Sequence, residues 1–194
     1  MKKYPESLLN LEELRKNTRL NKHQHFSAAE RAHKSNILCG VPVVVTNVFL
    51  GSLLFVSLSE AVPVTTVWIG GFLALGAAFC SALQTFFNFD KLFEGHRRIA
   101  NRYLQLQRDC EIAKSEYLDG VSNKNGLTYE YRKILNEYNG VNCDAESYHT
   151  GKCDYRLAIE YDKKKCKEED NKVMRQRLEN SMRKLSYMRG KSKK

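Results

Sequence analysis

Charged side chains are almost missing from one long stretch of this 194-residue chain. Between Ile37 and Phe89 the only charged residue is Glu60, although Lys, Arg, Asp and Glu make up 28% of the whole chain. A soluble domain spreads its apolar residues at the regular spacing of a helix face or a strand face. The concentration of apolar residues in one block therefore argues against an ordinary soluble domain.

Two apolar runs fill this stretch. The first, residues 37–58, would be about 33 Å long as a helix, against a hydrocarbon core of roughly 30 Å. The second, residues 65–89, is slightly longer, and Pro63 lies in the short connection as a turn or helix-start residue. We therefore predict a transmembrane hairpin. A buried helical hairpin of a soluble protein is the alternative; a signal peptide is disfavoured because a second run follows at once.

Lys and Arg are missing from the connection between the runs and present on both outer flanks. Arg31 and Lys34 precede the first run, and Lys91 and Arg97 follow the second. The bias of positive residues toward the cytoplasm then places both termini there, in a protein that crosses the inner membrane twice. Four cysteines would lie in this reducing compartment, where we expect them to remain thiols.

The motifs of common enzymes are also missing. The chain has no Gly-rich phosphate loop, no His-Glu-x-x-His and no Gly-x-Ser-x-Gly. His23 and His25 flank Gln24 as a weak metal-binding pattern, and the group between Cys143 and Cys153 lacks the close pairs typical of zinc sites. We predict that the protein is not an enzyme and needs no metal or cofactor.

The polar remainder of the chain is rich in helix-forming residues and carries no strand signal, so the expected fold is all-α. Residues 1–36 should form a cytoplasmic amphipathic helix with net charge +4 that lies along the second helix. Residues 37–89 form the hairpin, and residues 90–119 extend its second helix into the cytoplasm. Residues 120–194 form a basic, Tyr-rich helical region, with a short helix from Thr128 to Tyr138 and a long helix from Tyr155 to Met188.

Residues 90–119 carry a heptad-like stripe with spacings of three and four. Its members are Leu92, His96, Ile99, Tyr103, Leu106, Cys110, Ala113 and Tyr117. Packing within the monomer and a contact between subunits both explain such a stripe. Because nothing after Phe89 demands a break, we predict one continuous helix that joins the membrane to the cytoplasm.

The second span carries two patterned sets of residues. Four small residues recur every four positions and offer a surface for close helix packing: Gly70, Ala74, Ala78 and Ala82. Polar residues share another face, and two more lie in the first span: Ser81, Gln84, Thr85 and Asn88, with Thr46 and Asn47. They predict either a pore lining or hydrogen bonds between helices. Since two helices cannot enclose a water path, a pore requires a homo-oligomer.

Aromatic and basic residues alternate in the C-terminal region. Stacking combined with cationic contacts is typical of proteins that hold single-stranded nucleic acid or nucleotides. The candidate residues are Tyr129, Tyr131, Arg132, Lys133, Tyr155, Arg156, Tyr161, Lys163, Lys164 and Lys165. The structural alternative is that the tyrosines edge a helical core. Residues 172–194 hold nine Lys and Arg against one acid, which fits either an anionic partner or a solvated helix end.

Residues 25–120 resemble the SLATT family, the SMODS and SLOG-associating two-transmembrane effectors. The likeness lies in the basic N-terminal helix, the Gly-containing first span, the Gly/Ala-rich second span and its continuation FNFDKLFEGHRRIANRY. The resemblance implies a bacterial antiphage effector: a homo-oligomeric membrane channel of four subunits that kills or arrests an infected cell. It also implies control by a nucleotide or a DNA oligomer made by a partner nucleotidyltransferase, as in Hailong-type systems.

Together these observations predict an oligomeric membrane effector whose cytoplasmic helices bind a nucleotide-type ligand and gate a pore. The alternative is a non-conducting membrane anchor that recruits nucleic acid or a partner protein through its basic helices. The sequence leaves the sign of the ligand's effect open.

Overall fold

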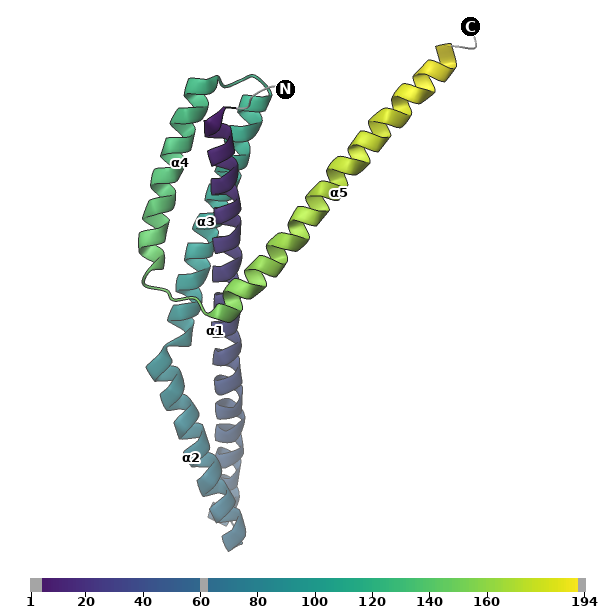
Figure 1. Cartoon of the computed structure of the whole chain (residues 1–194). Coiled ribbons are helices and arrows are strands. Elements are labelled where there is room, and N and C mark those ends of the chain that lie inside the picture. Colours follow the sequence, from purple (N-terminus) through teal and green to yellow (C-terminus); the bar gives the residue numbers. More distant parts are fainter. Residues whose placement is uncertain (1–4, 60–62, 192–194) are drawn as a thin grey trace.

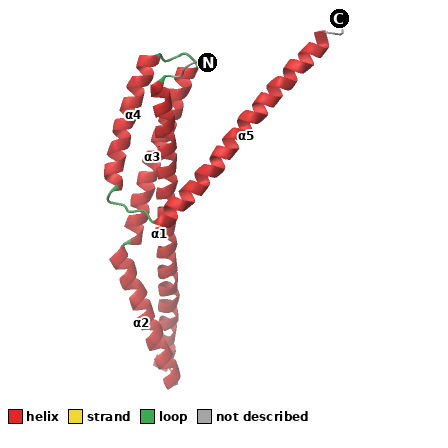
Figure 2. Ribbon diagram, in the orientation of Figure 1, coloured by secondary structure: helices red, strands yellow, loops and turns green. Residues whose placement is uncertain are grey.

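The computed structural model describes residues 5–59 and 63–191, and within these ranges every regular element is a helix. The helices are α1 (Glu6–Ser59), α2 (Val64–Phe87), α3 (Phe89–Leu118), α4 (Lys124–Ala145) and α5 (Lys152–Lys191). Figure 2 shows the absence of strands from the described residues, so the all-α prediction is confirmed. The middle of the connection between the two apolar runs, residues 60–62, lies outside the described residues.

Helix α1 is the longest element and passes through both halves of the molecule (Figure 1). It runs for 54 residues, or about 80 Å, without interruption, and contains Pro42. Its N-terminal half packs beside α3, as predicted for residues 1–36, and its C-terminal half packs beside α2. The predicted border at residue 36 is therefore not a break in the backbone.

The second apolar helix is broken where we predicted continuity. Asn88 has a left-handed backbone with φ 45°, between the end of α2 and the start of α3. Its backbone N–H donates to the carbonyl oxygen of Gln84 at 2.9 Å, and its side chain accepts from the N–H of Lys91 at 3.4 Å. Asparagine tolerates this conformation and caps helix ends, so one residue ends α2 and starts α3. The prediction of one uninterrupted helix is wrong at this residue.

The core of the molecule lies where α1, α3 and α4 meet. Leu8, Leu11 and Leu14 of α1 pack against the predicted stripe of α3, in which Ile99 and Leu106 are almost fully buried. Further members of this core are Tyr103, Cys110, Ala113, Leu127, Ile134 and Val141. From His96 to Ala113 the stripe is thus buried within the monomer, whereas Leu92 at its start is exposed.

Helices α4 and α5 are longer than predicted. Asn123 rather than Thr128 caps α4, since its side chain accepts from the N–H of Gly126 at 2.9 Å. Gly140 lies inside α4 instead of ending it, and α5 begins at Lys152 after a short loop. Figure 1 shows α5 leaving the bundle as an arm after its first turns.

Candidate functional site

The apolar half of the molecule exposes its side chains. Two helices of the described chain are long and apolar enough to cross a membrane. Val45 in α1 is 62% exposed and Leu75 in α2 is 70% exposed, and in α2 only Gly70 and Ala77 are buried. Contiguous apolar surface of this extent on a monomer marks contact with lipid or with other protein. It is not the surface of a soluble core helix, which would be mostly buried.

Gln84 connects α2 to α1 at one end of this apolar half. Its Nε2 donates to the backbone oxygen of Asn36 at 3.1 Å and to the Asn36 side-chain oxygen at 3.0 Å. Asn36 in turn donates to Asp90 at 2.7 Å. Three polar residues from α1, α2 and α3 are therefore linked at the break in the second helix. These contacts are those expected of a residue that connects helices, the alternative to pore lining that the sequence offered for Gln84.

The other polar residues of the spans are placed differently. Thr85 is exposed and its hydroxyl donates to the backbone oxygen of Ser81 at 3.0 Å, so that its own helix satisfies it. Asn88 is occupied as the cap described above. Thr46 is half-buried, whereas Asn47 is exposed on α1. Asn47 is thus the candidate pore residue whose amide faces away from the α1–α2 contact.

The small residues of α2 do not all meet α1. Gly70 is buried, and a Cβ atom there would lie 3.5 Å from Cδ2 of Leu50 and 3.8 Å from Cδ1 of Leu53. Ala74, Ala78 and Ala82 are exposed. Of the four small residues, only Gly70 is therefore buried against α1. The next buried residue of α2 is Ala77, which was not one of the four.

A buried histidine pair lies in the bundle, on the far side of the Gln84–Asn36–Asp90 contact from the apolar half. Nδ1 of His25 in α1 and Nδ1 of His96 in α3 are 3.0 Å apart, and the residues are 6% and 3% exposed. A hydrogen bond between them requires one ring to carry its proton on Nδ1 and the other to accept there. Burial, and then the charge of the other ring, lowers the pKa of His25 to about 4. Burial likewise lowers the pKa of His96, so both rings are neutral at neutral pH.

Asp154 places the start of α5 beside the His25–His96 pair. Its carboxylate is buried, lies 2.8 Å from Nη2 of Arg31, and accepts from the N–H of Gly151 at 2.7 Å. Tyr148, from the loop between α4 and α5, packs edge-on against His96. Its ring fills the space above Gly95, where a Cβ atom would collide with it at 1.8 Å. Glycine at position 95 therefore allows the ring of Tyr148 to approach α3 closely.

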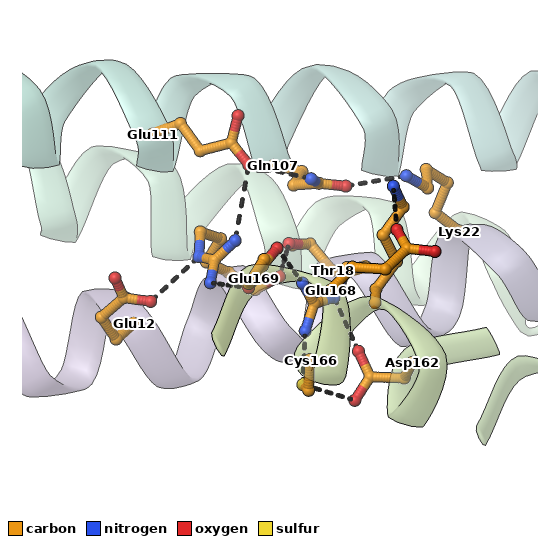
Figure 3. Close-up of polar contacts among 12 residues, drawn as sticks. Glu12, Thr18, Lys22, Gln107, Glu111, Asp162, Cys166, Glu168 and Glu169 are labelled. Carbon is orange, nitrogen blue, oxygen red and sulfur yellow. Dashed lines mark hydrogen bonds and ion pairs between the residues drawn. The ribbon is translucent and has the colours of Figure 1, made fainter. Parts of the chain in front are cut away.

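Two arginines of α1, Arg19 and Arg15, fasten α5 to the bundle further along, and Figure 3 labels their α5 partners Asp162 and Glu169. Arg19 is 3% exposed; its Nε lies 2.6 Å from Asp162 and its Nη1 lies 2.9 Å from Glu169. Burial alone would lower the pKa of Arg19, but the two carboxylates raise it overall. Arg15 lies 3.5 Å from Glu111 of α3 and 3.7 Å from Glu169 of α5, so it joins three helices.

The predicted nucleotide-binding residues fall into two separate groups. Tyr129, Tyr131, Arg132 and Lys133 lie on α4, and the other six lie on α5, which diverges from α4 in Figure 1. Several are engaged within the monomer: the ring of Tyr161 lies tilted against that of His23 with centroids 3.6 Å apart, Lys165 pairs with Glu168, and Tyr131 packs against the core. The exposed residues of the set include Tyr129, Arg132, Lys133, Tyr155, Arg156, Lys163 and Lys164.

Sequence reasoning missed the buried polar groups that attach α5. Thr18 and His25 continue the stripe of Leu11 and Leu14 at helical spacing, and all four are buried. Polar residues in register with an apolar stripe were a signal that this face holds more than a leucine core. Asp154 and Arg19 gave no such signal, because their partners are more than a hundred residues away.

Among the described residues, no group of three or more His, Cys, Asp or Glu side chains is arranged to hold a metal ion. All six cysteines are free. Comparison with protein-family models, curated proteins and solved structures finds no match to this chain.

Proposed function

We propose that the protein is a homo-oligomeric membrane effector that crosses the membrane as the α1–α2 pair and forms a pore controlled by a nucleotide-type ligand. The observation that carries this proposal is the exposed apolar surface of α1 and α2 beside a closely packed polar bundle. Contact with lipid stabilises the apolar surface, and contact with water stabilises the polar surface of the bundle. The resemblance to the SLATT family supports the antiphage role, the killing or arrest of an infected cell, and the inner-membrane location with both termini in the cytoplasm.

The pore requires several copies, because one hairpin leaves polar groups of its spans on its outer surface. Asn47 is exposed there, and an exposed amide in hydrocarbon is unfavourable. A second copy that packs on the free small residues of α2 would bring such groups into an interior. The family resemblance favours four subunits.

The contacts between α5 and the bundle near the break at Asn88 supply a route by which a ligand could control the pore. Helix α5 is attached at Asp154 and Asp162, and Asp154 lies beside the His25–His96 pair above the break at Asn88. A ligand that binds the open basic and aromatic residues of α5 shifts the pore only through different affinities for its two forms. Tyr155, Arg156, Lys163 and Lys164 are the residues we assign to this contact, with a DNA oligomer as the ligand class.

The test uses the full-length protein in lipid vesicles. We expect it to release an encapsulated dye or carry current, and we expect Asn47→Leu to reduce that flux at least tenfold while oligomer mass stays unchanged. Val45→Leu, at a neighbouring exposed position, is the matched control and should conduct normally. Full conductance in Asn47→Leu would remove Asn47 from the pore, and no conductance in the parent protein with or without DNA oligomers would reject the pore.

The second candidate is a non-conducting anchor that presents the bundle and α5 to nucleic acid or a partner protein. It is favoured by one observation: Gln84, Thr85 and Asn88 all find hydrogen-bond partners within the monomer. The two candidates differ in the vesicle assay. An anchor that binds single-stranded DNA would lose affinity steeply with salt but leave vesicles sealed.

A further inference from the structure

The outer part of α5 is a helix without a partner. Beyond Glu169, from Asp170 to Met182, every side chain of α5 whose exposure the structure describes is exposed. Met174, Leu178 and Met182 are 60%, 57% and 61% exposed and recur every four residues, so they form one apolar stripe. Lys172 and Arg175 flank it, within the strongly basic residues 172–194.

A groove between α3 and α4 has the opposite character. It has a volume of about 380 Å³, with the buried Ala113 and Ile134 as its apolar floor and the exposed Ile112 beside them. Its rim carries four carboxylates and one lysine: Asp109, Glu116, Glu130, Glu137 and Lys133. Partial burial, and then the neighbouring charges of Glu137 and Glu130, raises the pKa of Asp109. The groove therefore carries more negative charge than its own lysine balances.

We propose that the outer part of α5 docks in the α3–α4 groove of a second copy of this chain. The stripe from Met174 to Met182 covers the apolar floor, and the basic residues beside it face the carboxylates of the rim. The dimensions agree: the stripe spans about 12 Å of helix and the α3 side of the groove, from Gln105 to Glu116, about 16 Å.

The arm reaches a neighbour and not its own groove. In Figure 1, α5 projects from the bundle to the right while α4 lies at the left, and the outer part of α5 rises to the level of the upper α3 and α4. This step rests on the proposed function, because copies that share one membrane hold their arms and grooves at the same height. A contact from the arm of one copy to the groove of the next is head-to-tail, and it closes a ring if the rotation between copies permits.

Charge exchange tests the contact in the full-length protein. We expect Glu130→Lys with Glu137→Lys, and separately Lys172→Glu with Arg175→Glu, to lower the mass of the protein in detergent by at least half. All four substitutions together should restore the parental mass, because each new charge again meets its opposite. Light scattering measures the mass, and the helical circular dichroism signal checks folding.

Two further variants sharpen this test. Met174→Ser with Leu178→Ser changes only exposed residues, so it cannot disturb the core, and it should also dissociate the oligomer. Lys152→Glu with Lys167→Glu makes the same change of charge on exposed positions at the root of α5 and should leave the mass unchanged.

The proposal is overturned if both charge variants keep the parental mass, or if the fourfold exchange stays as dissociated as either half. It is also overturned if nuclease treatment alone dissociates the parent protein, since the arm would then hold nucleic acid. A restored oligomer that leaves vesicles sealed would support the arm contact and reject the pore. A protein that conducts and keeps its parental mass in every variant would support the pore and reject the arm contact.

Discussion

The two halves of α1 share one backbone conformation and differ in what surrounds them. In the N-terminal half, Leu11 is 1% exposed against α3, whereas in the C-terminal half Val45 is 62% exposed although α2 lies alongside. The bundle half is held by burial of apolar area away from water. The apolar half lacks that burial, so its stability has to come from a different solvent or from further copies.

The largest expected effect tests the bundle half. Leu11→Ala removes a fully buried side chain from the core and should lower the free energy of unfolding by about 2–5 kcal/mol. Leu9, two residues away on the same helix and 61% exposed, is the matched control. Leu9→Ala should change stability by less than about 0.5 kcal/mol. Denaturant titration in detergent measures both, and equal losses would show that this half of α1 does not pack as described.

The next effect tests the apolar half. Val45→Arg places a charge at the middle of the first span, where insertion costs about 2.5–3.5 kcal/mol. Val121, in the loop before α4, is 79% exposed and its replacement by arginine should have no effect on insertion. The readout is the fraction of protein that stays in membranes after alkaline extraction. If both variants remain equally in the membrane, the two halves of the molecule do not face different solvents.

How far the sequence predicts this structure differs between the same two halves. The apolar runs identify α1 and α2 because lack of charge over a span is a property of local sequence. The α3 stripe likewise predicts its buried residues, such as Ile99 and Leu106. The break at Asn88 depends on the tolerance of one residue for a left-handed backbone. The apolar and helix-forming residues on both sides predict a continuous helix, so the sequence pattern did not indicate this break. The Arg19 site joins residues more than 140 positions apart, and no periodicity reports such a contact.

The attachment of α5 gives the third effect. Arg19→Met leaves Asp162 and Glu169 without their common partner; because both acids reach solvent, we expect a loss of about 2–3 kcal/mol, below the cost for fully buried pairs. Lys34→Met removes a pair with Glu30 in which both side chains are exposed, and should leave the attachment of α5 unchanged because solvent screens such pairs. Hydrogen exchange over residues 152–169 measures the detachment. Unchanged protection in Arg19→Met would show that α5 is held by other contacts.

The histidine pair gives a pH-dependent effect on the same attachment. The pKa of His25 falls from 6.5 in the unfolded chain to about 4 in the fold, so the unfolded state binds more protons between these values. Stability is therefore complete above about pH 6.5 and declines as pH falls toward 4, by about 1–2 kcal/mol at pH 5. The groups facing the pair are Asp154, Arg31, Tyr103 and Tyr148.

His25→Leu isolates this effect, because a neutral side chain of similar size cannot take up a proton. The pH dependence of the unfolding free energy between pH 7 and 5 should become flatter than in the parent protein. His149→Gln, at an exposed position, should leave the slope unchanged. A slope that His25→Leu does not alter would assign the acid sensitivity to other groups, with His23 the next to test because burial lowers its pKa to about 4 as well.

The smallest effect lies at the boundary between the halves. Gln84→Leu removes the hydrogen-bonded contact between Gln84 and Asn36 and should destabilise the α1–α2 packing by about 0.6 kcal/mol, the average coupling energy for such a residue pair in a membrane protein. Thr85→Val, whose hydroxyl bonds only to its own helix, is the control and should have less effect. If Gln84 connects the helices, the variant keeps its conductance while α2 loses hydrogen-exchange protection near residue 84. Loss of current with unchanged protection would instead place Gln84 in the pore lining and separate the two roles that the sequence left open.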